Sequence, residues 1–141
     1  DSDATARTMP DGRLFTGDIG YLDDDSDLWV LSRRNDLIVS GGENVYPAEI
    51  ERIIMSHPAV AAAAVVCLPH DEWGQQVAAM VVTRPHEEIT SDELSTYLRE
   101  RLAGYKRPRI VEFVEELPLT GSGKINRSEV VRLLSAQVET P

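Results

Sequence analysis

The chain has 141 residues, 42% of them hydrophobic, which is enough to bury the core of one ordinary domain. Acidic side chains number 24 against 14 basic ones, and the formal net charge of -10 argues against nonspecific binding to nucleic acid or to an anionic membrane. No apolar run approaches the roughly 18 residues of a membrane span, and residues 1–10 lack the basic and apolar regions of a signal peptide, so the expected compartment is the cytoplasm. The single cysteine, Cys67, lies in an apolar run and is expected to be a buried structural thiol.

The first part of the chain has the pattern of short strands. Residues 13–15, 19–22 and 28–31 are expected to be extended, with an acidic turn over residues 23–27. This is hairpin-like material that is too small to fold alone. The pattern changes after it, and we expect a domain boundary near residues 32–36.

A strand at residues 37–39, a turn at Gly41-Gly42 and a helix come next. Pro47 is expected to open the helix, because proline suits the first helical position. The apolar stripe of the helix ends before Pro58 and consists of Ile50, Ile53 and Ile54. Residues 60–68 and 77–83 then read as two buried strands joined by a polar loop.

A second helix is predicted by the capping box that Thr90 and Glu93 form. Its apolar face is spaced as Leu94, Leu98 and Leu102, and Gly104 is expected to end it. Residues 110–114 form a further short strand, and Asn126 with Glu129 caps a third helix. Over about residues 37–138 the expected fold is α+β, a short sheet flanked by about three helices.

Four segments have an unusual residue order. They are Phe15-Thr16-Gly17-Asp18, residues 32–38 (Ser-Arg-Arg-Asn-Asp-Leu-Ile), residues 40–51 (Ser-Gly-Gly-Glu-Asn-Val-Tyr-Pro-Ala-Glu-Ile-Glu) and residues 118–125 (Pro-Leu-Thr-Gly-Ser-Gly-Lys-Ile). In the last, a flexible loop delivers the compact charge of Lys124 to one place. Each segment alone is typical of a surface turn. Together, in this order, they resemble the C-terminal end of the adenylate-forming enzymes, which include acyl-CoA synthetases, luciferases and the adenylation domains of peptide synthetases. The resemblance covers about residues 11–134.

This resemblance implies a two-step reaction. A carboxylate attacks the α-phosphate of ATP, giving an acyl-adenylate and pyrophosphate, and a thiol then displaces AMP after the small C-terminal domain has rotated. Lys124 matches the family's catalytic lysine, which bridges the carboxylate and α-phosphate oxygens. Asp18 matches the aspartate that accepts hydrogen bonds from the ribose hydroxyls, and Arg33 matches an arginine beside the nucleotide.

The resemblance also assigns a hinge and a coenzyme site. Asn35 occupies the pivot position, where aspartate or lysine is usual, and Phe15 and Ser32 depart from the usual arginine and glycine. Five residues match positions that meet the pantetheine arm, the coenzyme or its phosphates in some members, namely Gly41, Gly42, Trp73, Arg107 and Arg109. A simple tight turn, a tryptophan packed on its own domain and a solvated basic patch remain alternatives for these residues. The three histidines lack metal-ligand spacing, so no metal site is expected within the chain.

The sequence is therefore interpreted as residues 1–32 ending a large adenylation domain, a hinge at 33–36 and a mobile domain over 37–141. It resembles part of an ATP-dependent carboxylic acid CoA ligase. The substrate expected from the resemblance is a fatty or aromatic acid, with a long-chain fatty acid as the first expectation. ATP and magnesium would be bound mainly by an N-terminal domain in cis, and CoA would be the co-substrate. The chain alone is expected to be inactive, since no phosphate loop or acyl pocket is present in it. The alternatives are an adenylation domain that loads a carrier protein and a non-catalytic module that binds a nucleotide or a partner.

Overall fold

The computed structural model describes residues 2–138. The chain divides into two compact units, Asp1–Leu37 and Ile38–Pro141. The division falls one residue after the segment 33–36 that the sequence marks as a hinge. Whether that segment acts as a pivot remains a prediction.

The first unit contains one β-hairpin and short helical segments: α1 (Ser2–Thr8), η1 (Pro10–Gly12), β1 (Asp18–Leu22), β2 (Leu28–Arg33) and η2 (Arg34–Asp36). Strands β1 and β2 are antiparallel, with an irregularity in the register after Ile19. Asp23 organises the turn, because its carboxylate accepts hydrogen bonds from the Asp25 and Asp27 amides and from the Trp29 indole. Asp23 Oδ1, which accepts from both amides, thus closes an Asx-type turn. The hairpin predicted from the sequence is confirmed.

The predicted strand at residues 13–15 is wrong. These residues are irregular, and no strand in the described residues pairs with them. Gly12 and Gly17 on either side have φ of 74° and 75°, values in the left-handed region that interrupt an extended chain. Strand-forming side chains alone were therefore insufficient without a neighbouring strand.

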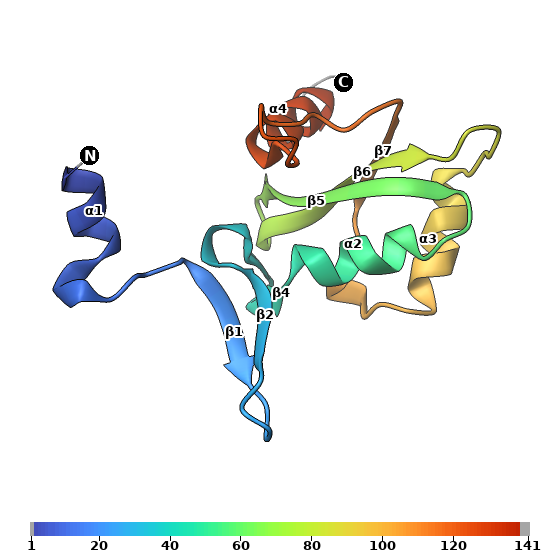
Figure 1. Ribbon diagram of the computed structural model, residues 1–141. Coiled ribbons are helices and arrows are strands. Elements are labelled where there is room, and N and C mark those ends of the chain that lie inside the picture. Colours follow the sequence, from blue (N-terminus) through green and yellow to red (C-terminus); the bar gives the residue numbers. More distant parts are fainter. Residues whose placement is uncertain (1, 139–141) are drawn as a thin grey trace. The chain divides into compact units, whose positions relative to one another are not determined.

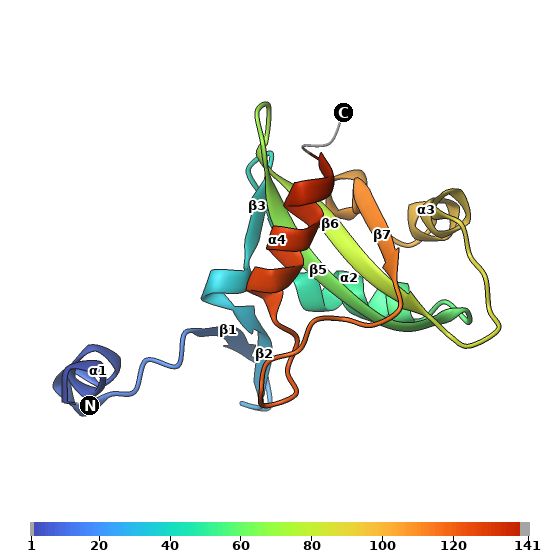
Figure 2. The same cartoon turned by 90° about the horizontal axis from the view of Figure 1, so that it is seen from above.

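The second unit is built on a three-stranded sheet in the order β5-β6-β7. Its elements are β3 (Ile38–Ser40), β4 (Glu43–Val45), α2 (Pro47–Met55), β5 (Val60–His70), β6 (Gly74–Thr83), α3 (Ser91–Arg99), η3 (Gly104–Lys106), β7 (Ile110–Val114) and α4 (Arg127–Val138). Strand β6 is antiparallel to β5 and parallel to β7, and β3 forms a separate hairpin with β4. Helices α2 and α3 cover one face of the sheet, and α4 covers the other (Figures 1 and 2).

Two apolar clusters form the core of this unit, one on each face of the sheet. The first joins residues of β3, α2, β5, β6 and α3, including Ile50 and Leu98, and the second joins α4 to β5 and β6 through Val130 and Leu134. The alanines of β5 divide between the faces, Ala63 in the first cluster and Ala64 in the second. Small side chains let helices pack closely on both faces, so tertiary packing overrides the helix propensity of alanine. The predicted α+β class, a short sheet with three helices around it, is confirmed.

The capping box of α3 is present as predicted: Thr90 Oγ1 accepts from the Glu93 amide and the Glu93 carboxylate accepts from the Thr90 amide. The predicted end of this helix at Gly104 is wrong, since α3 ends at Arg99 and Gly104 starts η3. Leu102 is nevertheless buried, because its amide bonds to the Leu98 carbonyl and a further turn carries it into the core. The apolar spacing of Leu94, Leu98 and Leu102 therefore continues beyond the residue at which α3 ends.

Candidate functional site

The two residues matched to nucleotide binding lie side by side in the first unit. Asp18 on β1 is directly opposite Arg33 on β2, and the Arg33 Nε lies 2.9 Å from the Asp18 Oδ1. The side chains of Asp18 and Arg33 are 30% and 63% exposed respectively, so both groups are accessible to a ligand. The arginine also donates to the Thr16 carbonyl at 3.4 Å. The ion pair fixes the arginine beside a carboxylate that retains a second oxygen for hydroxyl donors.

The predicted pivot residue, Asn35, is exposed at the centre of the 3-10 turn η2. This turn is fastened at its start, where the Arg34 amide donates to the Gly17 carbonyl at 2.7 Å. At its end the Leu37 amide donates to the Arg34 carbonyl at 3.4 Å, close to the limit for a hydrogen bond. The backbone hydrogen bond at the start of η2 is thus shorter than the one at its end.

Gly41 and Gly42 form the two-residue turn between β3 and β4. The partners Ser40 and Glu43 close the hairpin around them, and both glycines have positive φ, 59° and 86°. A two-residue turn with positive φ at both positions is the arrangement that matches strand twist, and it favours glycine. A Cβ at either position would meet nothing within 4 Å. The backbone alone thus requires the glycines, and the open space beside them is available to a ligand.

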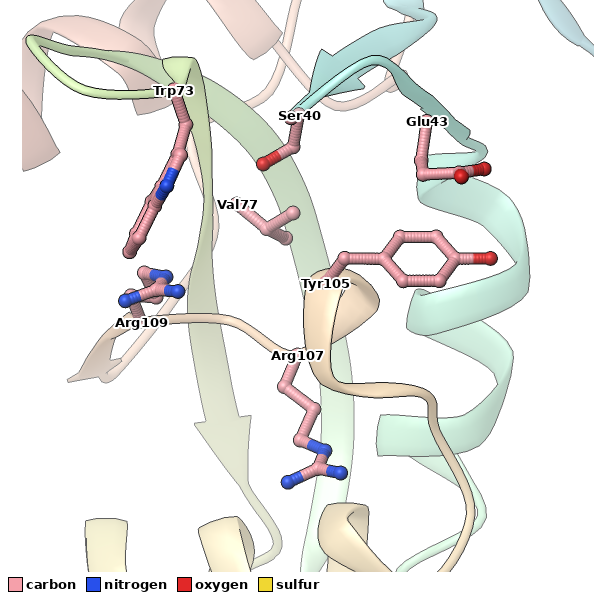
Figure 3. A pocket seen from close by; sticks show the side chains of 8 residues that line it. Ser40, Glu43, Trp73, Val77, Tyr105, Arg107 and Arg109 are labelled. Atoms are coloured by element: carbon pink, nitrogen blue, oxygen red, sulfur yellow. The ribbon is translucent and has the colours of Figure 1, made fainter.

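Four of the five residues matched to coenzyme binding line one pocket of about 290 Å³ in the second unit (Figure 3). It brings together the β3–β4 turn, the start of β6 and the segment around η3. Trp73 and Arg109 lie on one side of it, and Tyr105 and Glu43 on the other (Figure 3). The full lining is Ser40, Gly41, Glu43, Trp73, Val77, Tyr105, Arg107 and Arg109.

Trp73 is the middle layer of a stack of three side chains. His70 lies parallel to one face of the indole, with ring centroids 4.4 Å apart, and the Arg109 guanidinium lies 3.5 Å from the ring centroid. Cation–π contact and stacking orient the arginine without using its hydrogen-bond donors. His70 Nδ1 accepts from the Trp73 amide, which fixes the turn that carries the indole. The guanidinium is thereby held at the pocket with donors to offer.

Arg107 is held differently, by one hydrogen bond from its Nε to the Leu102 carbonyl at 2.9 Å. That hydrogen bond does not use the two terminal nitrogens of the guanidinium. Both arginines line the pocket, although in Figure 3 the Arg107 side chain extends away from Arg109 and Trp73. Guanidinium groups suit phosphate oxygens, which accept several hydrogen bonds at once. The backbone of this segment is tied to the sheet, since the Arg109 amide donates to the Val77 carbonyl.

Lys124 lies at the end of a compact loop that has its own hydrogen bonds. The Thr120 amide donates to the Lys124 carbonyl at 2.7 Å, and the Asn126 amide donates to the Pro118 carbonyl at 2.8 Å. Gly123 has φ of 80°, which explains the second glycine of the loop. The Lys124 side chain is exposed, and no carboxylate in the described residues 2–138 pairs with its ammonium. The loop thus presents an uncompensated cation.

Sequence reasoning missed the side chains that hold these segments. Glu49 and Glu51 of α2 bind Lys106 and Arg127 respectively, and neither pair was predicted. The partners are 57 and 76 residues apart in the chain, so no local pattern joins them. Tyr105 could have been found, because it directly precedes the basic segment that the sequence singled out.

The remaining titratable residues offer no metal site in the part of the chain that the structure describes, where no group of three histidine, cysteine or acidic side chains could hold an ion. Cys67 is a half-buried free thiol packed against the first core cluster. His57 packs edge-on against Tyr97 and accepts a hydrogen bond from the Ala59 amide. Among residues 2–138, none of the helices has the length and apolar character needed to cross a membrane.

The arrangement is that of the small domain of an adenylate-forming enzyme. The AMP-binding enzyme C-terminal domain family matches residues 49–124, more than half of the chain, and the chain belongs to this family. The resemblance read from the sequence is confirmed.

Individual relatives agree with the family. A 2-succinylbenzoate–CoA ligase of Bacillus cereus (strain Q1) is 51% identical over 132 residues, which are 94% of this chain and 27% of the relative. An o-succinylbenzoate CoA synthetase from Bacillus subtilis, solved with its acyl-adenylate, superposes with a TM-score of 0.85 at 43% identity, over 92% of this chain and 26% of that one. A fatty acyl CoA synthetase of Mycobacterium tuberculosis superposes with a TM-score of 0.74 at 41% identity, over 96% of this chain and 27% of that one. The chain thus spans about a quarter of these proteins.

Proposed function

We propose that this chain is the C-terminal part of an ATP-dependent acid–thiol ligase that forms an acyl-adenylate and then an acyl-CoA. The observation that carries the proposal is the pocket, which gathers Gly41, Trp73, Arg107 and Arg109 from three separate segments. Two arginines beside a glycine turn suit a ligand with phosphates at one end and a slender arm. Family membership supports the same reaction.

In the first step Lys124 would act on the reacting atoms. Its ammonium would contact a carboxylate oxygen of the acid and an α-phosphate oxygen of ATP, which orients the attack and stabilises the negative charge in the transition state. Asp18 would accept hydrogen bonds from the ribose hydroxyls, with Arg33 beside it. ATP and its magnesium would be held mainly by a large domain upstream, since residues 2–138 contain no group of three histidine, cysteine or acidic side chains that could hold the ion.

In the second step the pocket would serve the thiol substrate. Arg107 and Arg109 would bind phosphate oxygens of CoA, and the turn at Gly41 and Gly42 would leave room for the pantetheine arm. The thiol then attacks the acyl carbon and AMP leaves. Rotation about the segment at Asn35 would exchange the lysine loop for the pocket between the two steps, in line with the division of the chain into two units shortly after η2.

The carboxylic acid is the least constrained part of the proposal. Among the relatives described above, those of Bacillus cereus and Bacillus subtilis are named for 2-succinylbenzoate, whereas the Mycobacterium tuberculosis relative is named for the fatty acyl group expected from the sequence. We propose an aromatic acid of the 2-succinylbenzoate type, supported by the 51% identity to the Bacillus cereus ligase. A fatty acid is the comparison substrate.

The test is a chimera in which this chain replaces the matching C-terminal part of the Bacillus subtilis synthetase. Pyrophosphate release measures adenylation, and thioester formation from premade acyl-adenylate measures the second step. Lys124→Ala should slow adenylation about a hundredfold, as expected for a lost preorganised charge contact, and should change thioester formation less than about threefold. Arg132→Ala, which removes an exposed cation of α4, is the matched control.

The outcomes separate the competing functions. Equal losses in both half-reactions for Lys124→Ala would make the lysine structural. A chimera that forms adenylate but transfers it only to a carrier-protein thiol would favour the carrier-loading alternative. A folded chimera without either activity would favour a non-catalytic module. Comparing 2-succinylbenzoate with a fatty acid requires the complete protein, since the acid pocket of the chimera comes from the synthetase.

A further inference from the structure

Helix α2 contacts two segments of the second unit that carry candidate functional cations, the segment that carries Lys124 and the segment that carries Arg107 and Arg109. Its residues Glu49 and Glu51 are two positions apart, which places them about 200° apart around the helix axis. They therefore point to opposite sides and reach different elements. This geometry follows from the helix alone and makes two separate contacts possible from one short element.

Glu51 makes the deeper of the two contacts. It is 8% exposed, and its carboxylate receives both terminal nitrogens of Arg127, at 2.7 and 3.2 Å. The same carboxylate accepts the Val65 amide at 2.8 Å, while Arg127 donates to the Val65 carbonyl at 2.6 Å. A two-pronged ion pair of this kind fixes distance and orientation together. It joins α2, the middle of β5 and the first residue of α4.

This contact lies directly beside the lysine loop. Arg127 follows Lys124 by three residues, and the loop between Pro118 and Asn126 is closed by its own backbone bonds. Such a loop moves as one piece. Its placement on the domain is set where it is attached, by Leu117 and Ile125, which pack against the second core cluster, and by the bonds of Arg127.

Glu49 makes the contact on the other side. Lys106 Nζ lies 2.8 Å from both of its carboxylate oxygens, with the two side chains 21% and 33% exposed. This hydrogen bond raises the pKa of Lys106 above its usual value, so the lysine stays protonated at neutral pH. Lys106 ends η3 and stands between the pocket residues Tyr105 and Arg107. The contact therefore ties the basic segment of the pocket to α2.

We propose that α2 positions the two functional segments independently. Glu51, acting through Arg127, places the loop of Lys124 for adenylate formation. Glu49, acting through Lys106, places the arginine segment of the pocket for thioester formation. The inference rests on the proposed function for the roles of the two segments, while the two contacts themselves are visible in the fold. All four residues are positioning residues and touch no reacting atom.

The first experiment uses the 141-residue chain and needs no catalytic activity. Amide hydrogen exchange is measured in the loop at residues 118–126 and in the turn at residues 103–107. Glu51→Gln, which keeps an acceptor for the Val65 amide, should speed exchange at least about fivefold in the loop alone. Glu49→Gln should do so in the turn alone. Glu129→Gln breaks an exposed ion pair with Arg132 on α4 and should change neither segment.

The second experiment measures both half-reactions in the chimera described above. Glu51→Gln should slow adenylation about tenfold, with thioester formation from premade adenylate within twofold of the parent. Glu49→Gln should raise the KM for CoA about tenfold and leave adenylation within twofold. Arg127→Lys keeps the charge but loses the two-pronged geometry, and should resemble Glu51→Gln.

Each result has a defined meaning. Losses shared equally by both half-reactions, or exchange that rises in both segments together, would overturn independent positioning and make the contacts general stabilisers. Local exchange changes with unaltered kinetics in an active chimera would also overturn it. If the parental chimera is itself inactive, the proposed function fails, and the exchange experiment still decides whether the two contacts hold their segments separately. A variant that does not fold is replaced by Arg127→Lys or by Lys106→Arg at the same contact.

Discussion

The two units of this chain differ in where their apolar side chains lie. Every buried hydrophobic residue among residues 2–138 belongs to the second unit, whereas the first exposes Phe15, Leu28 and Val30 to more than 60% of their surface. A two-stranded hairpin has too little interior to bury its own side chains. The second unit is thus stabilised by its own core. The turn at Asp23 sets the local shape of the first unit. The exposed apolar side chains of that unit are suited to packing against other protein surface.

The largest expected effect contrasts one leucine from each unit. Leu98 is 2% exposed in the first core cluster and Leu28 is 69% exposed on β2. Leu98→Ala should lower the free energy of unfolding by about 2–5 kcal/mol, the cost of lost burial and a cavity, and Leu28→Ala should lie within about 0.5 kcal/mol of the parent. Urea unfolding of the 141-residue chain measures both. Comparable losses would mean that the hairpin shares the core.

A smaller effect is expected at the junction between the units. Asn35→Pro fixes φ near -65° and restricts Arg34 before it, which should stiffen η2. In the chimera we expect adenylation near the parental rate and thioester formation slowed about tenfold or more, because the second step requires the rotation. Asn35→Ala leaves φ free and serves as the control. A proline variant with both half-reactions unchanged would place the pivot elsewhere.

The smallest effects concern two carboxylates, one from each unit. Hydrogen bonds from Thr90 lower the pKa of Glu93, and the hydrogen bond from the Trp29 indole lowers the pKa of Asp23. A carboxyl group with a lowered folded-state pKa contributes stability above its unfolded pKa, about 4, and loses it as pH falls through the folded value. Thr90→Ala should cost the main unfolding transition about 1 kcal/mol at neutral pH, and less at pH 3.

Asp23→Asn tests the same linkage in the first unit. Since that unit has no core of its own, the main unfolding transition should be unchanged at both pH values. Only the Trp29 fluorescence should respond, because the bond from its indole to the Asp23 carboxylate is weakened. A shift in the main transition would show that the hairpin and the core unfold together.

Much of the fold was predictable because its signals are local. Pro47 marks a helix start through its fixed φ, and the Thr90–Glu93 box marks another through reciprocal hydrogen bonds with backbone amides. Residues 110–114 form β7 as expected. The errors have a common cause. The strand at residues 13–15 lacked a partner, and the end of α3 depended on how Leu102 enters the core, neither of which a local pattern contains.

For the candidate site, motifs located the residues but not their arrangement. The sequence pointed to Trp73 and Arg109, yet their stacking depends on β6 and η3 meeting at the pocket. Val77 and Ser40 line the same pocket without any distinguishing pattern. The roles of Lys124, Asp18, Arg33 and Asn35 remain predictions.

The contact of Glu51 and Arg127 with Val65 has a consequence for solubility. Strand β5 is an edge of the sheet, and its apolar residues at 60–68 would make it a template for pairing with another chain. The amide and carbonyl at the middle of that edge are occupied by a carboxylate and a guanidinium instead. The ion pair thus occupies the outward-facing backbone groups of Val65 and interrupts the row of donors and acceptors with which an added strand would pair, a device that disfavours edge-to-edge aggregation.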